Sequence, residues 1–255
     1  MAVVEPQLPE LSVREQDCLA ELQRTYGREH TQFELVKFVI ALKGDYDRCV
    51  ERLHNYRREL LPRFRPEAVR ARHVRSLLQR QVLQLPGSRD RDGATVIVYN
   101  AHRHVKTTSD EQREEALKAV IYLIELATYQ QGTLRNGIAL VANLTSVGMS
   151  QLDGPMHQFV LSVLQNAYPA RLKHVYVINP NLWVHALITV SRPFMKRKLA
   201  ERVVVVPSYD RLQEHIHPDE LITQFGGRRT FDPVAWLESI TVRRNRVHQL
   251  PSAPL

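Results

Sequence analysis

The pattern of apolar and polar positions changes near residue 86. Before that point, apolar residues recur at helical spacing, which predicts helices from Ser12, over about 32–42 and over about 46–61. A further basic helix is predicted from Pro66 to Leu83. Ser12 and Glu15 have the spacing of a capping box. These patterns predict an N-terminal lobe made of helices.

After residue 86, short runs of β-branched residues alternate with helical patterns. Strands are predicted over about 95–99, 138–144, 174–178 and 203–206. Helices are predicted from Ser109, over about 156–166 and 182–190, as short pieces over 210–221, and from Asp232 onward. Strands joined by helices of about ten residues or more need crossover connections. The expected fold class is therefore α/β, with a mostly parallel mixed sheet flanked by helices.

This change of pattern also sets the expected domain boundaries. We expect a flexible leader over 1–10, a helical lobe over 11–85 and a second lobe over 86–240. The turn-rich segment 86–93 would link the two lobes. A basic and then proline-rich tail over 241–255 would complete the chain.

Positive charge is the strongest feature of the composition. The formal net charge is +8, which favours an anionic partner such as nucleic acid, acidic lipid or an acidic protein. The segment 57–80 contains eight arginines, at positions 57, 58, 63, 65, 70, 72, 75 and 80. Their segment shows no aromatic interleaving of the kind that stacks bases. We therefore expect no nucleic-acid partner, and an unidentified protein partner stays open.

The sequence also indicates a compartment. No apolar run approaches the roughly 20 residues of a membrane span, and the N-terminus lacks the basic and apolar regions of a secretory signal. Two cysteines, Cys18 and Cys49, are too few for a disulfide framework and are typical of a reducing compartment. We expect a cytoplasmic protein that associates peripherally with membranes.

Signatures of catalysis are weak. The chain has no glycine-rich phosphate loop, dinucleotide fingerprint or nucleophile elbow. Cys18 and Arg24 have the spacing of a tyrosine phosphatase loop, but the segment between them contains no glycine and favours a helix. The paired histidines at 102 and 104, and at 215 and 217, lack further ligands nearby. We expect no enzymatic activity, no metal and no cofactor.

The stretch from 168 to 202 combines a strand, an apolar helix and a cluster of cations. The apolar face of the helix consists of Leu182, Trp183, Ala186, Leu187 and Val190. The cations that follow are Arg192, Lys196, Arg197, Lys198 and Arg202. This order is typical of a surface that meets an anionic membrane or closes over an amphiphile. A plain core helix that covers one face of the sheet is the alternative.

Several short motifs occur in an order found in one family of lipid-binding proteins. They are Tyr168-Pro169-Ala170-Arg171-Leu172, Val177-Ile178-Asn179-Pro180, Arg192-Pro193-Phe194 and Phe225-Gly226-Gly227, with Gly44-Asp45-Tyr46-Asp47 and Asn55-Tyr56-Arg57 upstream. In these motifs the chain resembles the CRAL-TRIO family over roughly residues 12–240. Within that family, the stretches 131–141 and 169–173, together with Trp183, look most like the N-terminal lipid-binding domain of the megakaryocyte-type non-receptor tyrosine phosphatase.

The resemblance implies an apolar pocket closed by a mobile gate helix. It implies that the protein binds one phospholipid or other hydrophobic molecule and exchanges it at membranes. On this mapping the gate is the helix of Leu182, Trp183, Ala186, Leu187 and Val190. The pocket would be lined by Val96, Val98, Ile138, Leu140, Val175 and Val177. The five cations from Arg192 to Arg202 would contact lipid phosphates or the membrane.

Two positions depart from the members of the family that bind phosphatidylinositol. Ala170 stands where they carry a glutamate, and Arg202 stands where they carry a lysine. The sequence therefore favours a more anionic phospholipid, such as phosphatidylserine or a polyphosphoinositide, or a hydrophobe with little head group. Our first hypothesis is a lipid carrier. The second is an adaptor that binds phosphoinositide-rich membrane or acidic proteins through its basic faces without extracting lipid. A third hypothesis, nucleic-acid binding, rests on charge alone.

Overall fold

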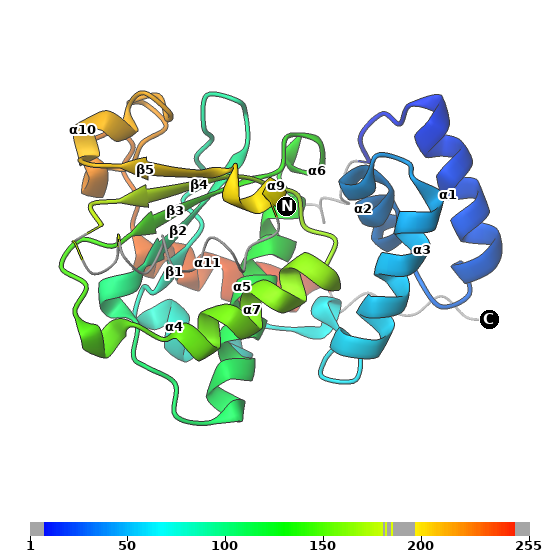
Figure 1. Cartoon of the computed structure of the whole chain (residues 1–255), viewed down its shortest axis with the longest axis horizontal. Coiled ribbons are helices and arrows are strands. Elements are labelled where there is room, and N and C mark those ends of the chain that lie inside the picture. Colours follow the sequence, from blue (N-terminus) through cyan, green and yellow to red (C-terminus); the bar gives the residue numbers. More distant parts are fainter. Residues whose placement is uncertain (1–7, 181, 183–184, 186–196, 248–255) are drawn as a thin grey trace.

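The computed structural model describes residues 8–180, 182, 185 and 197–247 (Figure 1). Three helices at one end of the molecule open the fold: α1 (Val13–Tyr26), α2 (Gln32–Leu42) and α3 (Tyr46–Asn55). The capping box is confirmed, because the backbone N–H of Ser12 donates to the Glu15 carboxylate at 2.9 Å. A π-helical turn over Tyr56–Leu60 extends α3, so the third predicted helix is confirmed as well.

The predicted helix from Pro66 to Leu83 is wrong. In its place the chain forms 3-10 turns over Pro66–Ala68 and Ala71–His73, the short helix α4 (Arg75–Gln79) and the strand β1 (Leu83–Gln84). Val69 and Arg70 have extended backbone, and Val69 and Val74 are both buried. Packing of these apolar side chains against the core outweighs the helical propensity of the segment.

Five strands form one sheet in the order β1-β2-β3-β4-β5. The long strands are β2 (Thr95–Asn100), β3 (Ile138–Asn143), β4 (Leu172–Ile178) and β5 (Val203–Val206). They run parallel to one another, and β1 is antiparallel to β2. This confirms the predicted α/β class with a mostly parallel sheet.

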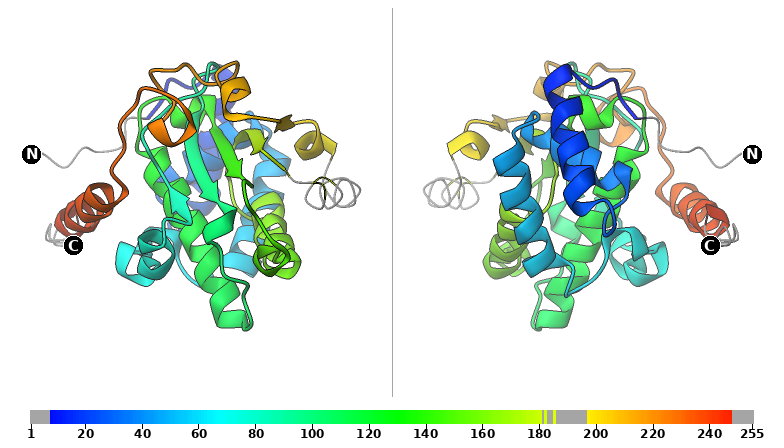
Figure 2. Two further views of the ribbon diagram at one scale, coloured as in Figure 1. Left: turned by 90° about the vertical axis from the view of Figure 1, so that its left-hand side faces the viewer. Right: turned by 90° about the vertical axis from the view of Figure 1, so that its right-hand side faces the viewer.

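Helices lie on both faces of the sheet. The crossover helices α5 (Asp110–Thr128) and α7 (Gly154–Asn166) lie on one face, and α10 (Tyr209–Leu212) lies on the other (Figure 2). The short helices α6 (Thr133–Asn136) and α9 (Arg197–Ala200) precede β3 and β5. The last helix, α11 (Pro233–Val247), packs against α4. In the described part of the chain, no helix is both long and apolar enough to cross a bilayer.

Two large apolar clusters form the core. The first extends from α1–α3 through α5 and α7 to Ile97 and Ile138 on one face of the sheet. The second covers the opposite face and joins Val96, Val98 and Tyr176 to the chain that follows β5. Because the first cluster runs without interruption from the N-terminal helices to the sheet, we expect the helical lobe to depend on the sheet lobe for its stability.

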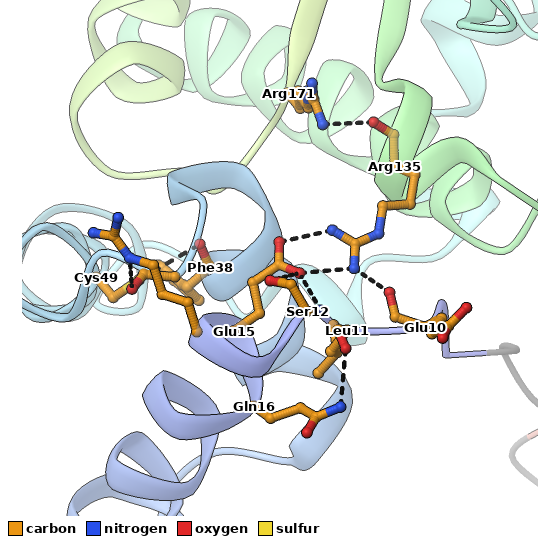
Figure 3. Close-up of polar contacts among 11 residues, drawn as sticks. Glu10, Leu11, Ser12, Glu15, Gln16, Phe38, Cys49, Arg135 and Arg171 are labelled. Carbon is orange, nitrogen blue, oxygen red and sulfur yellow. Dashed lines mark hydrogen bonds and ion pairs between the residues drawn. The ribbon is translucent and has the colours of Figure 1, made fainter.

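A salt bridge also connects α1 to α6. Arg135 of α6 donates to both carboxylate oxygens of Glu15 in α1, at 2.7 and 2.8 Å (Figure 3). The same guanidinium contacts the carbonyl of Glu10, and the Arg135 carbonyl accepts a bond from Arg171 at 2.6 Å. These bonds fix α1 against the amino-terminal edge of β3.

Candidate functional site

The strand register decides which side chains share a face. Leu140, Val175 and Val203 are neighbours across β3, β4 and β5. Ala142 lies beside Val177 in the next row that faces the same way. Alternate residues of a strand point to the same face, so these rows belong to the face that also carries α5 and α7.

One part of this face is aliphatic but belongs to neither large core cluster of the described residues. Its members are Ala142, Val175, Val177, Val203 and Val205, which we call the aliphatic patch. Val175, Val203 and Val205 are only half-buried. Under β2 and β3, by contrast, Ile97 and Ile138 pack in the same core cluster as α5 and α7. Ala142 and Val177 are buried, so the part of the patch that the described helices do not fully cover consists of Val175, Val203 and Val205. This part is apolar surface and suits contact with a hydrophobic molecule.

The structure does not bring the six predicted pocket residues together. Val175 and Val177 lie in the aliphatic patch. Ile138 is buried in the first core cluster, and Leu140 packs against it. Side chains alternate along a strand, and the sequence pattern alone did not show which members of each apolar run face the same way.

The other two predicted pocket residues, Val96 and Val98, lie on the opposite face of the sheet. They are buried in the second core cluster. With Val141 and Phe225 they line a cavity of about 10 Å³. A space of this size holds about one water molecule, which is far too small for a lipid chain.

The predicted gate helix falls mostly outside the described residues. Four of its five apolar residues lie outside the described part of the chain: Trp183, Ala186, Leu187 and Val190. Leu182 is helical and 89% exposed. The gate therefore stays a prediction.

Two of the predicted phosphate contacts can be placed, and both lie on the segment that leads into β5. Arg197 is exposed and pairs with Glu201 at 2.9 Å. Arg202 donates to the carbonyl of Leu172. Arg192, Lys196 and the side chain of Lys198 lie outside the described residues.

A polar pair that the sequence did not single out lies next to the patch. The Tyr99 hydroxyl and His157 Nε2 are 3.0 Å apart. Tyr99 pairs with Ala142 in the register, so its ring starts the row that continues through Val177 to Val205. His157 is one turn into α7, and its side chain is exposed. The only sequence signal for Tyr99 is its place in the predicted strand, and none marked His157.

Buried polar groups hold this pair in place. Asp153 accepts a bond from the backbone of Met156 at the start of α7, and its other oxygen lies 3.2 Å from Nε2 of the buried His104. Burial opposes ionisation of Asp153, but bonds from Thr107 outweigh it and lower the pKa to about 2. The aromatic rings of His104, Tyr99 and His157 pack against one another. The start of α7 is therefore rigidly tied to β2.

Surrounding protein shifts the titration of both members of the pair. It lowers the pKa of His157 and raises the pKa of Tyr99, because each charged form loses hydration. Near pH 7 the pair is therefore a neutral hydrogen-bonding group beside an aliphatic surface.

The structure also places the residues that the sequence offered for catalysis or metal binding. Cys18 lies within the continuous helix α1, buried and 3.9 Å from the sulfur of Cys49. Burial raises the pKa of both thiols, which is the opposite of what a nucleophilic thiolate needs. Within the described ranges, no three His, Cys, Asp or Glu side chains lie close enough to hold a metal ion.

The chain is similar to known proteins over most of its length. It is 24% identical to human tyrosine-protein phosphatase non-receptor type 9 over 240 residues, which cover 89% of this chain and 40% of the phosphatase. It is 27% identical to the mouse alpha-tocopherol transfer protein-like protein over 243 residues, which cover 89% of this chain and 69% of that one. The chain thus spans less than half the length of the phosphatase.

Structural comparison gives the same fold. The crystal structure of Sfh5 matches with a TM-score of 0.60 at 14% identity, over 94% of this chain and 98% of that one. The family model described as the CRAL/TRIO domain matches residues 79–227, which is more than half of the chain. This protein therefore belongs to the CRAL-TRIO family.

Proposed function

We propose that this protein carries one phospholipid or other hydrophobic molecule on its aliphatic patch and exchanges it at anionic membranes in the cytoplasm. CRAL-TRIO proteins bind and transfer hydrophobic ligands, and the family is generally non-enzymatic. The observation that carries the proposal is the patch itself, five aliphatic side chains on three neighbouring strands outside both large core clusters. The lobe over 86–240 would hold the ligand, and the helical lobe over 11–85 would support it.

The patch supplies the binding energy in this proposal. Neighbouring strands lie about 4.8 Å apart, so three strands span about 10 Å, roughly twice the width of an acyl chain. Each buried methylene contributes about 0.8 kcal/mol. A helix over 182–190 would close the patch from the water side. No charged side chain belongs to the patch, so the ligand would be recognised there mainly by its shape and apolar surface.

Positive charge would hold the carrier at an acidic membrane. The exposed arginines include Arg58 at 71%, Arg65 at 62% and Arg197 at 92% side-chain exposure, and each would exchange its present glutamate partner for a lipid phosphate. Each cation near an anionic surface contributes up to about 1 kcal/mol, and salt weakens that attraction. Phosphatidylserine or a polyphosphoinositide would supply the opposite charge, and the ligand would then enter from that membrane.

A substitution that fills the patch tests this proposal. Val205→Trp adds a large ring in the half-buried last row, so we expect ligand uptake to fall at least tenfold while the fold persists. Val234→Trp adds the same ring at an exposed position of α11 and should leave uptake unchanged. Each protein would be incubated with phosphatidylcholine vesicles containing 30% phosphatidylserine and re-isolated. Extracted lipids would be counted by mass spectrometry, with circular dichroism as the measure of folding.

The outcomes separate carrier from adaptor. Uptake by wild type and loss in folded Val205→Trp would support the carrier. Undiminished uptake in the folded variant would show that the patch is not the site. A wild-type protein that binds these vesicles but extracts no lipid would instead favour the adaptor, which acts through its basic faces alone.

A further inference from the structure

Two basic segments that lie far apart in the sequence are neighbours in the fold. The first, residues 68–84, contains arginines at 70, 72, 75 and 80 and no aspartate or glutamate. The second, residues 239–255, contains arginines at 243, 244 and 246 and again no acidic residue. Helix α11, which includes the start of the second segment, packs against α4 and against the 3-10 turn over Ala71–His73. The packing therefore places two acid-free segments side by side.

The arginines of the first segment lack acidic partners. Arg72, Arg75 and Arg80 are exposed, and none of them pairs with a carboxylate in the described part of the chain. Next to Arg80, Gln81 accepts a bond from the exposed Arg103 at 2.6 Å, which brings a fourth cation to the same place. We call Arg72, Arg75, Arg80 and Arg103 the basic surface.

The charge of this region acts on its own side chains. The pKa of His73 is lowered, first by burial and then by repulsion from Arg72, Arg70 and Lys118. Cations that are held close together repel one another, so an anionic partner that lies across several of them is attracted more strongly than by a single arginine. This positive potential is therefore available for a partner outside the described protein.

The basic surface lies on the side of the molecule away from the proposed ligand site. The strands β1, which follows α4, and β5 are the two edges of the sheet. Figure 2 shows α4 and α11 on one side of the molecule and β5 with α9 on the other. The half-buried Val203 and Val205 of the aliphatic patch belong to β5. A membrane that meets the protein at the β5 edge would therefore leave the basic surface in contact with water.

We propose that the basic surface binds an acidic segment of a partner protein, rich in glutamate or aspartate, while the opposite edge of the sheet exchanges lipid. The arginine side chain presents a planar fork of donors that fits a carboxylate. Residues 68–84 contain no phenylalanine, tyrosine or tryptophan on which a nucleobase could stack. This inference rests on the proposed carrier function in one respect, the assignment of the membrane to the β5 edge.

The spacing of the arginines fits an extended acidic peptide. At about 1.5–2 Å per residue, the helical turns from Arg72 to Arg80 span about 12–16 Å. Side chains on one face of an extended peptide are about 6.7 Å apart, so three carboxylates at alternate positions span about 13 Å. A segment with an acidic residue at every second position can therefore reach Arg72, Arg75 and Arg80 together.

A labelled peptide tests the inference. The probe is a fluorescein-labelled peptide of Glu-Ser repeats, and the control peptide has Gln-Ser repeats of the same length. Fluorescence anisotropy at low salt would measure the Kd of each peptide for the full chain. We expect Arg72→Gln, Arg75→Gln and Arg80→Gln together to weaken binding of the acidic peptide about tenfold or more, since each exposed ion pair changes affinity about twofold to fivefold. Added salt should weaken wild-type binding.

A second triple variant removes the same charge from another part of the molecule. Arg24, Arg28 and Arg48 are exposed at the N-terminal helices, and Glu21 and Glu29 are close to the first two in the sequence. Changing these three arginines to glutamine lowers the net charge equally and should weaken peptide binding less than about threefold. Circular dichroism would verify that both triple variants fold.

The results separate the possible occupants of the basic surface. Equal losses in the two triple variants would overturn the inference, because net charge alone would then explain the binding. So would a wild-type protein that does not prefer the acidic peptide to the neutral one. Unchanged peptide binding by the first variant, with weaker binding to phosphatidylserine vesicles, would assign the surface to a membrane instead.

Lipid extraction separates this inference from the carrier function. The variant of Arg72, Arg75 and Arg80 should extract as much lipid from the vesicles as wild type, because the aliphatic patch is unchanged. A wild-type protein that binds the acidic peptide through these arginines but extracts no lipid would overturn the carrier function and leave the protein-binding surface standing.

Discussion

At the scale of single residues, charged side chains do most to place the elements. Glu15 has two roles, because its carboxylate caps the start of α1 and binds Arg135 of the sheet lobe. The hydrogen bonds from Arg135 are the largest cause of its low pKa, about 2 against an ordinary value of 4.5. Burial acts in the opposite direction and is outweighed.

This shift predicts how stability depends on pH. The folded-state pKa of Glu15 lies below the unfolded-state value, so its contribution is present above about pH 4.5 and is lost as pH falls toward 2. The contribution is at most about 3 kcal/mol. Urea unfolding at pH 6 and pH 3 should show a smaller loss of stability in Glu15→Gln than in wild type. The exposed Glu21→Gln should behave as wild type, and equal losses in all three proteins would contradict the assignment.

At the scale of elements, Asp153 at the start of α7 has a second role besides capping the helix. Asp153 accepts a bond from the backbone of Met156, as a capping residue does. It also binds the buried His104 and the Thr107 loop, so one carboxylate joins α7 to the chain after β2. The same junction sets the distance between His157 and Tyr99. A change at Asp153 should therefore affect both stability and the polar end of the patch.

A pair of alanine variants separates these roles. Asp153→Ala should lower the free energy of unfolding by about 2–4 kcal/mol, because it removes the cap and leaves buried polar groups without a partner. Ser109→Ala removes only the exposed cap of α5 and should cost about 1 kcal/mol. Denaturant titration measures both. Equal losses would mean that the buried bonds of Asp153 add nothing to its capping role.

At the scale of the whole molecule, a buried ion pair joins the N-terminal helices to the helix that packs on the sheet. Lys37 of α2 lies 2.7 Å from the Glu125 carboxylate of α5, and both side chains are buried. The hydroxyl of Tyr168, just before β4, donates to the same carboxylate. A buried pair contributes little net energy, but removal of one partner is costly because the other charge is left in the interior.

This asymmetry predicts the effect of charge removal between the lobes. Lys37→Met should destabilise the protein by about 3–5 kcal/mol, since Glu125 would be buried without its counter-charge. Adding Glu125→Gln should restore most of that loss, because an amide needs no counter-ion and still accepts from Tyr168. Lys118→Met breaks a partly exposed pair with Glu114 and should cost less than about 1 kcal/mol. Thermal unfolding of the four proteins measures these differences, and an unrepaired double variant would contradict the explanation.

Much of the fold could be predicted from the sequence because most of its elements are strongly periodic. Helices α2 and α5, and strands β2 and β5, appear where spacing and β-branched runs predicted them. The segment over 66–83 could not be predicted in this way, because the burial of Val69 and Val74 against distant residues decides its backbone. Local propensity competes there with packing that the sequence does not display.

The candidate site was predictable only in part. Of the six expected pocket residues, Val175 and Val177 lie in the patch, and Val96 and Val98 lie on the far side of the sheet. An apolar run names the residues of a strand but not the face of each, and in the all-valine β5 no alternation is visible. Only the register shows that Val203 and Val205 face the same way as Val175 and Val177.

By itself, the sequence determined the class of fold, the family and the order of the elements outside residues 66–84, because these depend on local periodicity and on motifs that lie along the chain. The tertiary structure alone decided which valines share a face, that Tyr99 meets His157 across 58 positions of sequence, and that α1 is tied to α6. Contacts between distant segments arise from strand register and packing geometry. Neither is written in the spacing of apolar residues, because a shift of one position exchanges the two faces of a strand.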